Sequence, residues 1–226
     1  MPSFVRKAWL IYCKDLREEF RTTDHLLSTL VFGTMLVFVF SFALQLVEAA
    51  PEAIFPAVLW VSIVFMAILA LQRSFAKEKD SGALDALLLA AGDRSILFYA
   101  KFLFSLTVLL LLEVIVVPLL WVFMGAAGTT VHMPLFVAAV FLGSWGLAAV
   151  GTLLNGITVQ LPGARLLFPI LAFPLFVPLL IGAVLCTQGA LVGETRAVLG
   201  WLYLLAAFDL VFTIVPLLLF DYVLEG

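Results

Sequence analysis

The feature that most constrains the fold of this chain is the repeated occurrence of apolar runs long enough to cross a membrane. A transmembrane helix needs about 20 predominantly apolar residues to span a hydrocarbon core of about 30 Å. Six runs meet this requirement, at residues 26–47, 55–72, 96–124, 134–158, 166–187 and 197–220. The whole chain is 65% hydrophobic with a mean hydropathy of +1.22, which is typical of polytopic membrane proteins. We therefore predict an all-α membrane protein with six transmembrane helices in one domain, residues 1–226.

The distribution of lysine and arginine predicts the orientation of these helices. Cytoplasmic segments of membrane proteins are enriched in both residue types. If the N-terminus is cytoplasmic, all of the 12 basic residues except Arg196 fall on the cytoplasmic side. This topology places both termini in the cytoplasm and leaves only short outer loops.

The first 24 residues have the pattern of an amphipathic helix that lies along the membrane surface. At about 100° per residue, the basic side chains fall in one arc and apolar side chains project on the other side. The basic residues are Arg6, Lys7, Lys14, Arg17 and Arg21. The apolar residues are Phe4, Val5, Ala8, Trp9, Tyr12, Leu16 and Phe20. This arrangement suits contact with membrane lipids at the cytoplasmic headgroups.

One long polar interval, residues 74–94, separates the second and third predicted spans. Asp80 and Ser81 can cap a short helix over residues 83–91, which Gly92 would end. Such a helix lies outside the bilayer and has no core of its own to cover its leucines. These leucines are Leu84, Leu87 and Leu88. Two explanations for what covers these leucines stay open. They contact lipid headgroups or pack on the chain's own helix ends, or else they dock onto a partner protein.

The sequence offers little catalytic machinery. It contains no phosphate-binding glycine loop, no haem-attachment motif and no zinc-ligand spacing. The only cysteines, Cys13 and Cys186, fall at opposite membrane faces in the predicted topology, so we expect free thiols. We expect a non-enzymatic chain with no catalytic residue, no bound metal, no firmly bound cofactor and no nucleic-acid partner.

Two acidic residues fall inside predicted spans. Glu113 and Asp209 each lie about 18 Å from the cytoplasmic end of their helix. An ionised carboxylate is costly there, so we expect each to be protonated, hydrogen-bonded across helices, or in contact with a hydrated interior. A structural role as polar contacts and a functional role both stay open. In the outer loop, His132 is a weaker candidate as a haem ligand.

The fifth span contains Pro169, Pro174 and Pro178, each of which removes a backbone donor. The prolines predict a kinked or broken helix, which could be a moving hinge or a static feature. The fourth span carries small residues at close spacing, which predicts tight helix packing. These residues are Gly143, Ser144, Ala148, Gly151 and Thr152.

A final set of motifs extends along nearly the whole chain. Its most specific part covers residues 69–89 and includes Arg73, Phe75, Glu78, Gly82, Leu84, Asp85 and Leu88. Ala100-Lys101, Pro118, and Pro174 and Pro178 with their neighbours in the fifth span belong to the same set. Through these motifs the chain resembles the CcmB family, the permease subunit of the haem exporter for cytochrome c maturation. It departs from the family at Ala90-Ala91, where a proline is usual, and at Phe173-Pro174, where Leu-Pro is usual.

The resemblance implies a half-transporter of the type-2 ABC permease class in a bacterial inner membrane. Its implied partners are a separate ATP-binding subunit, a haem-handling C subunit, a small D subunit and a haem carrier, with haem as a possible substrate. The motif from Arg73 to Leu88 would supply the contacts that couple the chain to the ATPase, whereas Lys77, Lys79 and Asp80 are expected in a solvated loop. Two other functions are compatible with the sequence, which are a permease for lipid, polysaccharide or drug, and a non-transporting assembly scaffold.

Overall fold

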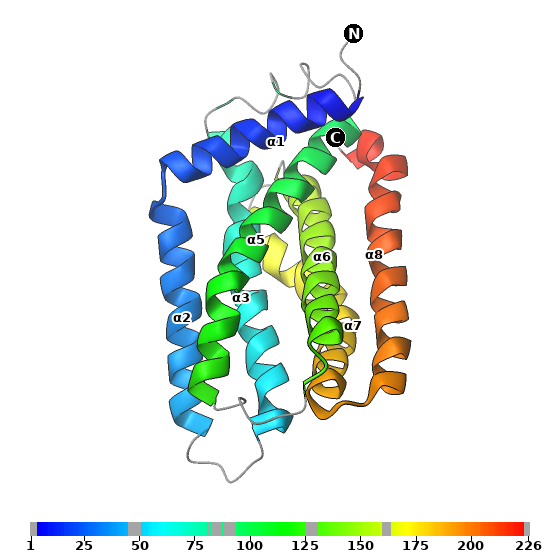
Figure 1. The fold of residues 1–226 in the computed structure, drawn as a ribbon. Coiled ribbons are helices and arrows are strands. Elements are labelled where there is room, and N and C mark those ends of the chain that lie inside the picture. The colour runs from blue at the N-terminus through cyan, green and yellow to red at the C-terminus, as the bar shows by residue number, and fades with distance from the viewer. Residues whose placement is uncertain are drawn as a thin grey trace.

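The computed structural model describes residues 4–44, 51–80, 82, 87, 94–124, 131–159 and 164–223. Within these ranges the secondary structure is entirely helical, and six of the helices are long and apolar enough to cross a membrane. They are α2 (Asp24–Leu44), α3 (Pro51–Asp80), α5 (Arg94–Met124), α6 (Met133–Thr158), α7 (Ala164–Val192) and α8 (Thr195–Val223). They run side by side in one bundle, and α1 (Phe4–Arg21) lies across one end of it (Figure 1). The predicted all-α, six-span fold is confirmed.

The helix α6 occupies the centre of the bundle and contacts α3, α5, α7 and α8. Its glycines receive bulky side chains from these neighbours. A Cβ on Gly143 would lie only 2.0 Å from the Trp60 ring, and one on Gly151 would lie 2.3 Å from Leu71. Close approach at these positions therefore requires glycine, which confirms the tight packing predicted for this span.

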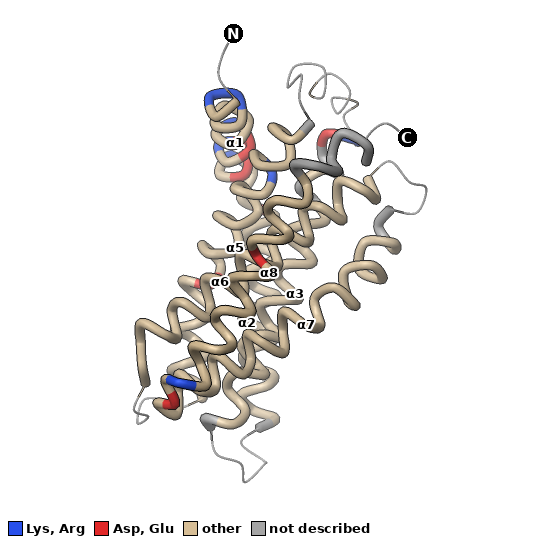
Figure 2. The backbone as a smooth tube through the Cα atoms, turned by 90° about the vertical axis from the view of Figure 1, so that its right-hand side faces the viewer, with Lys and Arg blue, Asp and Glu red and all other residues tan. Residues whose placement is uncertain are grey.

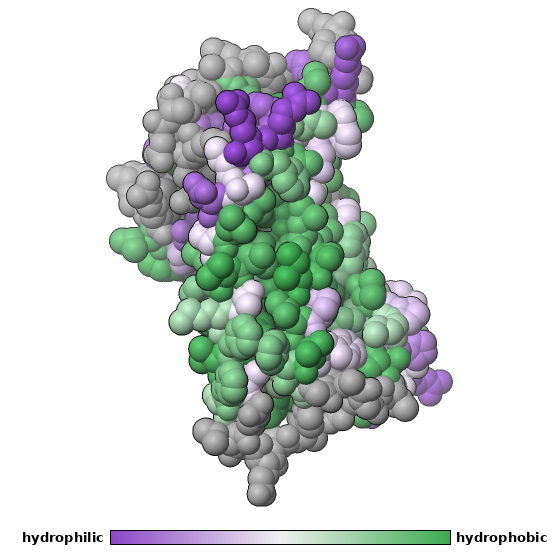
Figure 3. All heavy atoms as spheres, turned by 60° about the vertical axis from the view of Figure 1, so that its left-hand side comes forward, coloured by the Kyte–Doolittle hydropathy of each residue, from purple (hydrophilic) through white to green (hydrophobic). Residues whose placement is uncertain are grey.

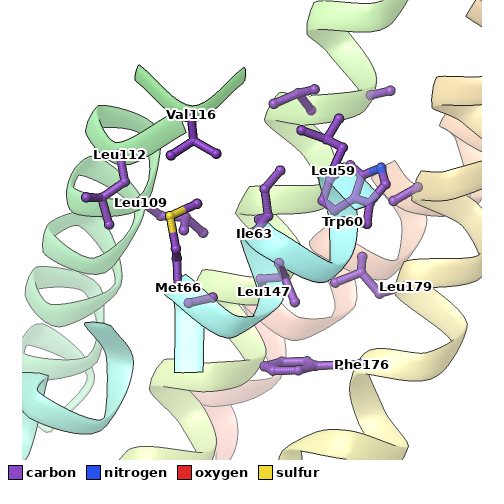
Figure 4. Packing of buried hydrophobic residues seen from close by; sticks show 14 of the residues in the cluster. Leu59, Trp60, Ile63, Met66, Leu109, Leu112, Val116, Leu147, Phe176 and Leu179 are labelled. Atoms are coloured by element: carbon purple, nitrogen blue, oxygen red, sulfur yellow. The ribbon is translucent and has the colours of Figure 1, made fainter. Parts of the chain in front are cut away.

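Side chains from four helices fill the core around α6. Figure 4 shows Trp60 and Ile63 of α3 beside Leu147 of α6, with Leu179 of α7 on one side and Leu112 of α5 on the other. Trp60 is fully buried, and its ring nitrogen donates a 2.9 Å hydrogen bond to the hydroxyl of Thr187 on α7.

The helix α3 is longer than the sequence predicts. Its apolar span ends at Gln72, but the helix continues through the charged residues to Asp80. Lys77, Lys79 and Asp80 are therefore helical and not in a solvated loop, because good helix formers follow one another here and nothing interrupts them before Gly82. Gly82 ends the helix with a φ of +69°, and its N–H donates to the carbonyl of Lys79.

The predicted cap and short helix of the polar interval are only partly within the described ranges. Asp80 is the last residue of α3, so it ends a helix and does not begin one. Ser81 and most of residues 83–91 lie outside the described residues. Leu87 is described and is helical.

The helix α7 passes through Pro169, Pro174 and Pro178 without a break. The broken-helix alternative is therefore wrong. Each proline removes a single donor, and the remaining backbone hydrogen bonds of a 29-residue helix suffice to keep it continuous. Whether these prolines form a hinge stays a prediction.

The helix α1 presents three different faces. Ala8 is buried in a small cluster with Ile96 and Ala100 of α5, and Ile11 packs against it. Val5, Trp9 and Phe20 are more than half exposed on a second face, and the basic arc forms the third. Figure 2 shows blue basic positions on α1, and Figure 3 shows hydrophilic side chains towards this end above a broad hydrophobic band.

Candidate coupling site

Four charged side chains meet where α1, α3 and α5 come together. The Nζ of Lys101 lies 2.9 Å from Oδ2 of Asp15 and also forms an ion pair with Glu78. The Nζ of Lys14 lies 3.0 Å from Oδ1 of Asp15 and 3.4 Å from Oε1 of Glu78. Each lysine thus contacts both carboxylates, and we call these four residues the charge ring.

Most of the charge ring is shielded from solvent. Lys101, Asp15 and Glu78 are 2%, 6% and 5% exposed, and the ammonium of Lys101 also lies 5.6 Å from the ring centroid of Phe75. Burial of a charge is costly unless the charge is paired. The ring meets this condition because its two positive and two negative charges balance.

Lys14 forms the more accessible edge of the ring, with its side chain 41% exposed. Partial burial acts to lower the pKa of Lys14, but attraction to Asp15 and Glu78 outweighs that effect, so this pKa lies above the usual lysine value. Lys14 is therefore positively charged at neutral pH. It connects the basic face of α1 to the buried carboxylates.

The sequence indicates only part of this site. Glu78 stands in the family motif, and Ala100-Lys101 in a weaker part of the same motif set. Asp15 was missed because an acid in a strongly basic helix is usually solvent-exposed. The available signal was its spacing from Ala8: seven residues, two helical turns, bring Asp15 to the same side of α1 as the buried alanine.

The end of α3 is also fastened to the end of α6. Lys79 donates a hydrogen bond to the carbonyl of Val159, the C-cap residue of α6, where a positive charge is favourable. One turn further in, the amide of Asn155 donates to the carbonyl of Leu71. The last three turns of α3 are thus held by α1, α5 and α6.

The predicted coupling residues fall into two groups. Phe75 and Glu78 are buried inside the chain, so they can position a partner-binding segment but do not offer a contact surface themselves. Gly82 is exposed. Arg73 lies in α3 with its side chain undescribed, and Leu84, Asp85 and Leu88 lie outside the described residues.

The position of Leu87 shows what covers one of the leucines between α3 and α5. Its side chain is half-buried and packs against the core cluster that contains Phe75, Phe98 and Val159. For Leu87, packing on the chain's own helix ends is therefore the explanation that holds.

The two intramembrane acids contact the central helix α6. The hydroxyl of Ser144 donates to Glu113, which confirms for Glu113 the hydrogen bond across helices. Asp209 is 5% exposed and lies against Gly146, and neither of its oxygens has a hydrogen-bond partner among the described residues. Ser144 and Gly146 are two residues apart, so the acids lie at similar depth on nearly opposite faces of α6, about 160° apart.

The remaining candidates stand apart from these sites. His132 is exposed at the start of α6, and both cysteines are free, as predicted. In the described part of the chain, no group of three or more His, Cys, Asp or Glu residues could hold a metal ion.

The chain matches a known protein family over almost its full length. A family model described as CcmB protein matches residues 6–221. The chain belongs to the CcmB family. No individual curated protein matched it.

The match runs from α1 to the last turn of α8, so the whole charge ring lies within the region that CcmB proteins share. CcmB proteins are membrane subunits of the ABC-type haem exporter for cytochrome c maturation. The resemblance seen in the sequence is thereby confirmed, and this CcmB protein is a multi-pass membrane subunit of a transport system.

Proposed function

We propose that this CcmB protein is the permease half of an ATP-driven complex, on which a separate ATPase subunit acts through the segment between α3 and α5. One observation carries this proposal most directly. This segment connects α3 to α5, and the ion pair of Glu78 and Lys101 joins the end of α3 to the early part of α5. A force applied to such a segment reaches α3 and α5 together.

We also propose the orientation and the partners. The end of the bundle that carries α1 faces the cytoplasm, because described basic positions gather there (Figure 2), whereas Arg196 is the second residue of α8, which begins at the opposite end (Figure 1). The start of α1 and the end of α8 both lie on that side (Figure 1). The expected partners are the C and D subunits and a haem carrier, with haem as the transported or released cargo.

The test places charge on the segment where the ATPase would bind. Replacing Leu84 and Leu88 by Asp would bury unpaired charge in the interface, at a cost of several kcal/mol, on the order of that of an interface hot spot. We expect normal chain levels in the membrane, loss of the ATPase from the purified complex and loss of ATP-dependent cytochrome c formation.

The matched control is Leu84→Met/Leu88→Met, which keeps both side chains apolar and should retain the ATPase. If Leu84→Asp/Leu88→Asp still binds the ATPase and still supports normal cytochrome c formation, the segment is not the coupling site.

A further inference from the structure

The charge ring joins three elements that the family motif does not connect. Glu78 lies two residues before the end of α3, and Lys101 lies seven residues into α5, about 10 Å along that helix. Their ion pair therefore closes the base of the segment between the two helices. Asp15 and Lys14 then attach α1 to this base.

The charge ring is the ionic part of the attachment of α1 to the bundle. Ala8 and Asp15 are the buried residues of α1. Its other described contacts are the apolar packing of Ile11, Tyr12 and Leu16 on the buried clusters, a 3.2 Å hydrogen bond between the hydroxyls of Tyr12 and Thr107, and an edge-on ring contact between Phe4 and Tyr99. The ring adds ion pairs that link α1 to both α3 and α5.

A buried ring of charges is a poor means of adding stability. Apolar residues of similar size often stabilise a protein as well as or better than a buried ion pair. What paired charges provide is one preferred arrangement, because any sliding of α1 leaves a buried charge without its partner. This property suits a junction that must transmit movement without slipping.

We propose that the charge ring is a positioning clasp that makes α1, α3 and α5 move as one unit when the ATPase acts on the segment between α3 and α5. Asp15, Lys14, Glu78 and Lys101 are positioning residues in this view, and none of them touches the ATPase. The proposal rests on the proposed function for its role in transport, but the clasp itself can be tested without transport.

The first measurement follows the segment directly. In a chain whose cysteines are replaced (Cys13→Ser/Cys186→Ser), the substitution Leu87→Cys places a reporter thiol at a half-buried position. Adding Lys101→Met or Asp15→Asn should raise the rate at which a maleimide labels this thiol in membranes at least threefold, because the base of the segment loosens. The double substitution Asp15→Asn/Lys101→Met leaves Lys14 balanced by Glu78, so it should label more slowly than Lys101→Met alone.

The second measurement follows coupling in the complete complex, without the reporter. Asp15→Asn and Lys101→Met should keep the ATPase bound and hydrolysing ATP, while the cytochrome c formed per ATP hydrolysed falls at least threefold. The control Thr187→Val removes the hydrogen bond to Trp60 near the opposite end of α3. Thr187→Val should change neither the labelling rate of Leu87→Cys nor the cytochrome c formed per ATP hydrolysed.

The outcomes separate the two proposals. In one outcome, Asp15→Asn and Lys101→Met label at the wild-type rate and form the wild-type amount of cytochrome c per ATP hydrolysed, with at most lower chain levels. This outcome would show that the ring only stabilises the fold, and it would overturn the clasp. If Lys101→Met does not accumulate, Asp15→Asn on the peripheral helix decides the question. Failure of the wild-type chain to bind an ATPase would refute the proposed function and not the clasp, which the labelling rates still test.

Discussion

Gly82 is the residue at which α3 ends and the proposed coupling segment begins. Its φ of +69° is strained for side chains with a Cβ, although among the described residues no heavy atom lies within 4 Å of where that Cβ would be. We expect Gly82→Val to cost about 1–2 kcal/mol in backbone strain without a steric clash. Chain levels should stay close to normal while cytochrome c formation falls severalfold.

Asparagine provides the matched control, because it adopts the left-handed conformation more readily than valine. Gly82→Asn should therefore form cytochrome c at close to the wild-type level. Equal cytochrome c formation by Gly82→Val and Gly82→Asn would show that the backbone conformation here does not matter.

Glu113 is bonded to Ser144 deep in the bundle, and we expect this contact to be structural. Glu113→Gln keeps an acceptor for the serine hydroxyl, so chain level and cytochrome c formation should be nearly normal. Glu113→Leu leaves the buried hydroxyl unpaired, which costs roughly 1 kcal/mol and should lower the chain level. A chain with Glu113→Gln that accumulates normally but forms no cytochrome c would instead indicate a role for the ionisable group.

At the scale of the helix, α1 combines an exposed basic arc, which we expect to contact lipid, with the charge ring. Arg6, Arg17 and Arg21 are exposed and lie outside the ring, so they test the lipid contact separately. Each should contribute on the order of 1 kcal/mol near anionic lipid. Reversing all three to Glu should lower the amount of assembled chain in membranes and the cytochrome c formed, whereas replacing all three by Lys should not. Unchanged assembly in the Glu variant would make this face of α1 dispensable.

Helix positions could be predicted from the sequence. The C-terminal end of α3 and the proline-containing course of α7 show the limits of that prediction. Apolar runs locate where a helix is inside the membrane, and all six spans were found in this way. They do not locate where a helix stops, which is why the charged extension of α3 to Asp80 was missed. The sequence left open whether α7 is kinked or broken, because a proline count does not report whether neighbouring turns keep their hydrogen bonds.

At the scale of the molecule, the charge ring could not have been predicted as a unit. The family motif singles out Glu78, but its partners lie 64 residues earlier at Lys14 and 23 residues later at Lys101. The packing of α3 against α5 brings Glu78 to Lys101, and the docking of α1 across the bundle adds Lys14 and Asp15. The distribution of Lys and Arg, in contrast, is visible in the sequence and predicts the orientation of the whole chain.

That orientation has a direct test. A reporter enzyme that is active only in the periplasm should be inactive when fused after Gly226 and active when inserted near Thr130. A cytoplasmic reporter at the same two positions should give the opposite result. Activity of the periplasmic reporter after Gly226 would contradict the proposed topology.

The central claim is that this CcmB protein serves cytochrome c maturation, and the most direct measurement is the covalent haem on c-type cytochromes in cells that lack the chain. Deletion should abolish haem-stained c-type cytochromes on denaturing gels while the apocytochromes and the b-type cytochromes remain, and the wild-type chain should restore them. Normal haem staining of c-type cytochromes in the deletion strain would contradict the account.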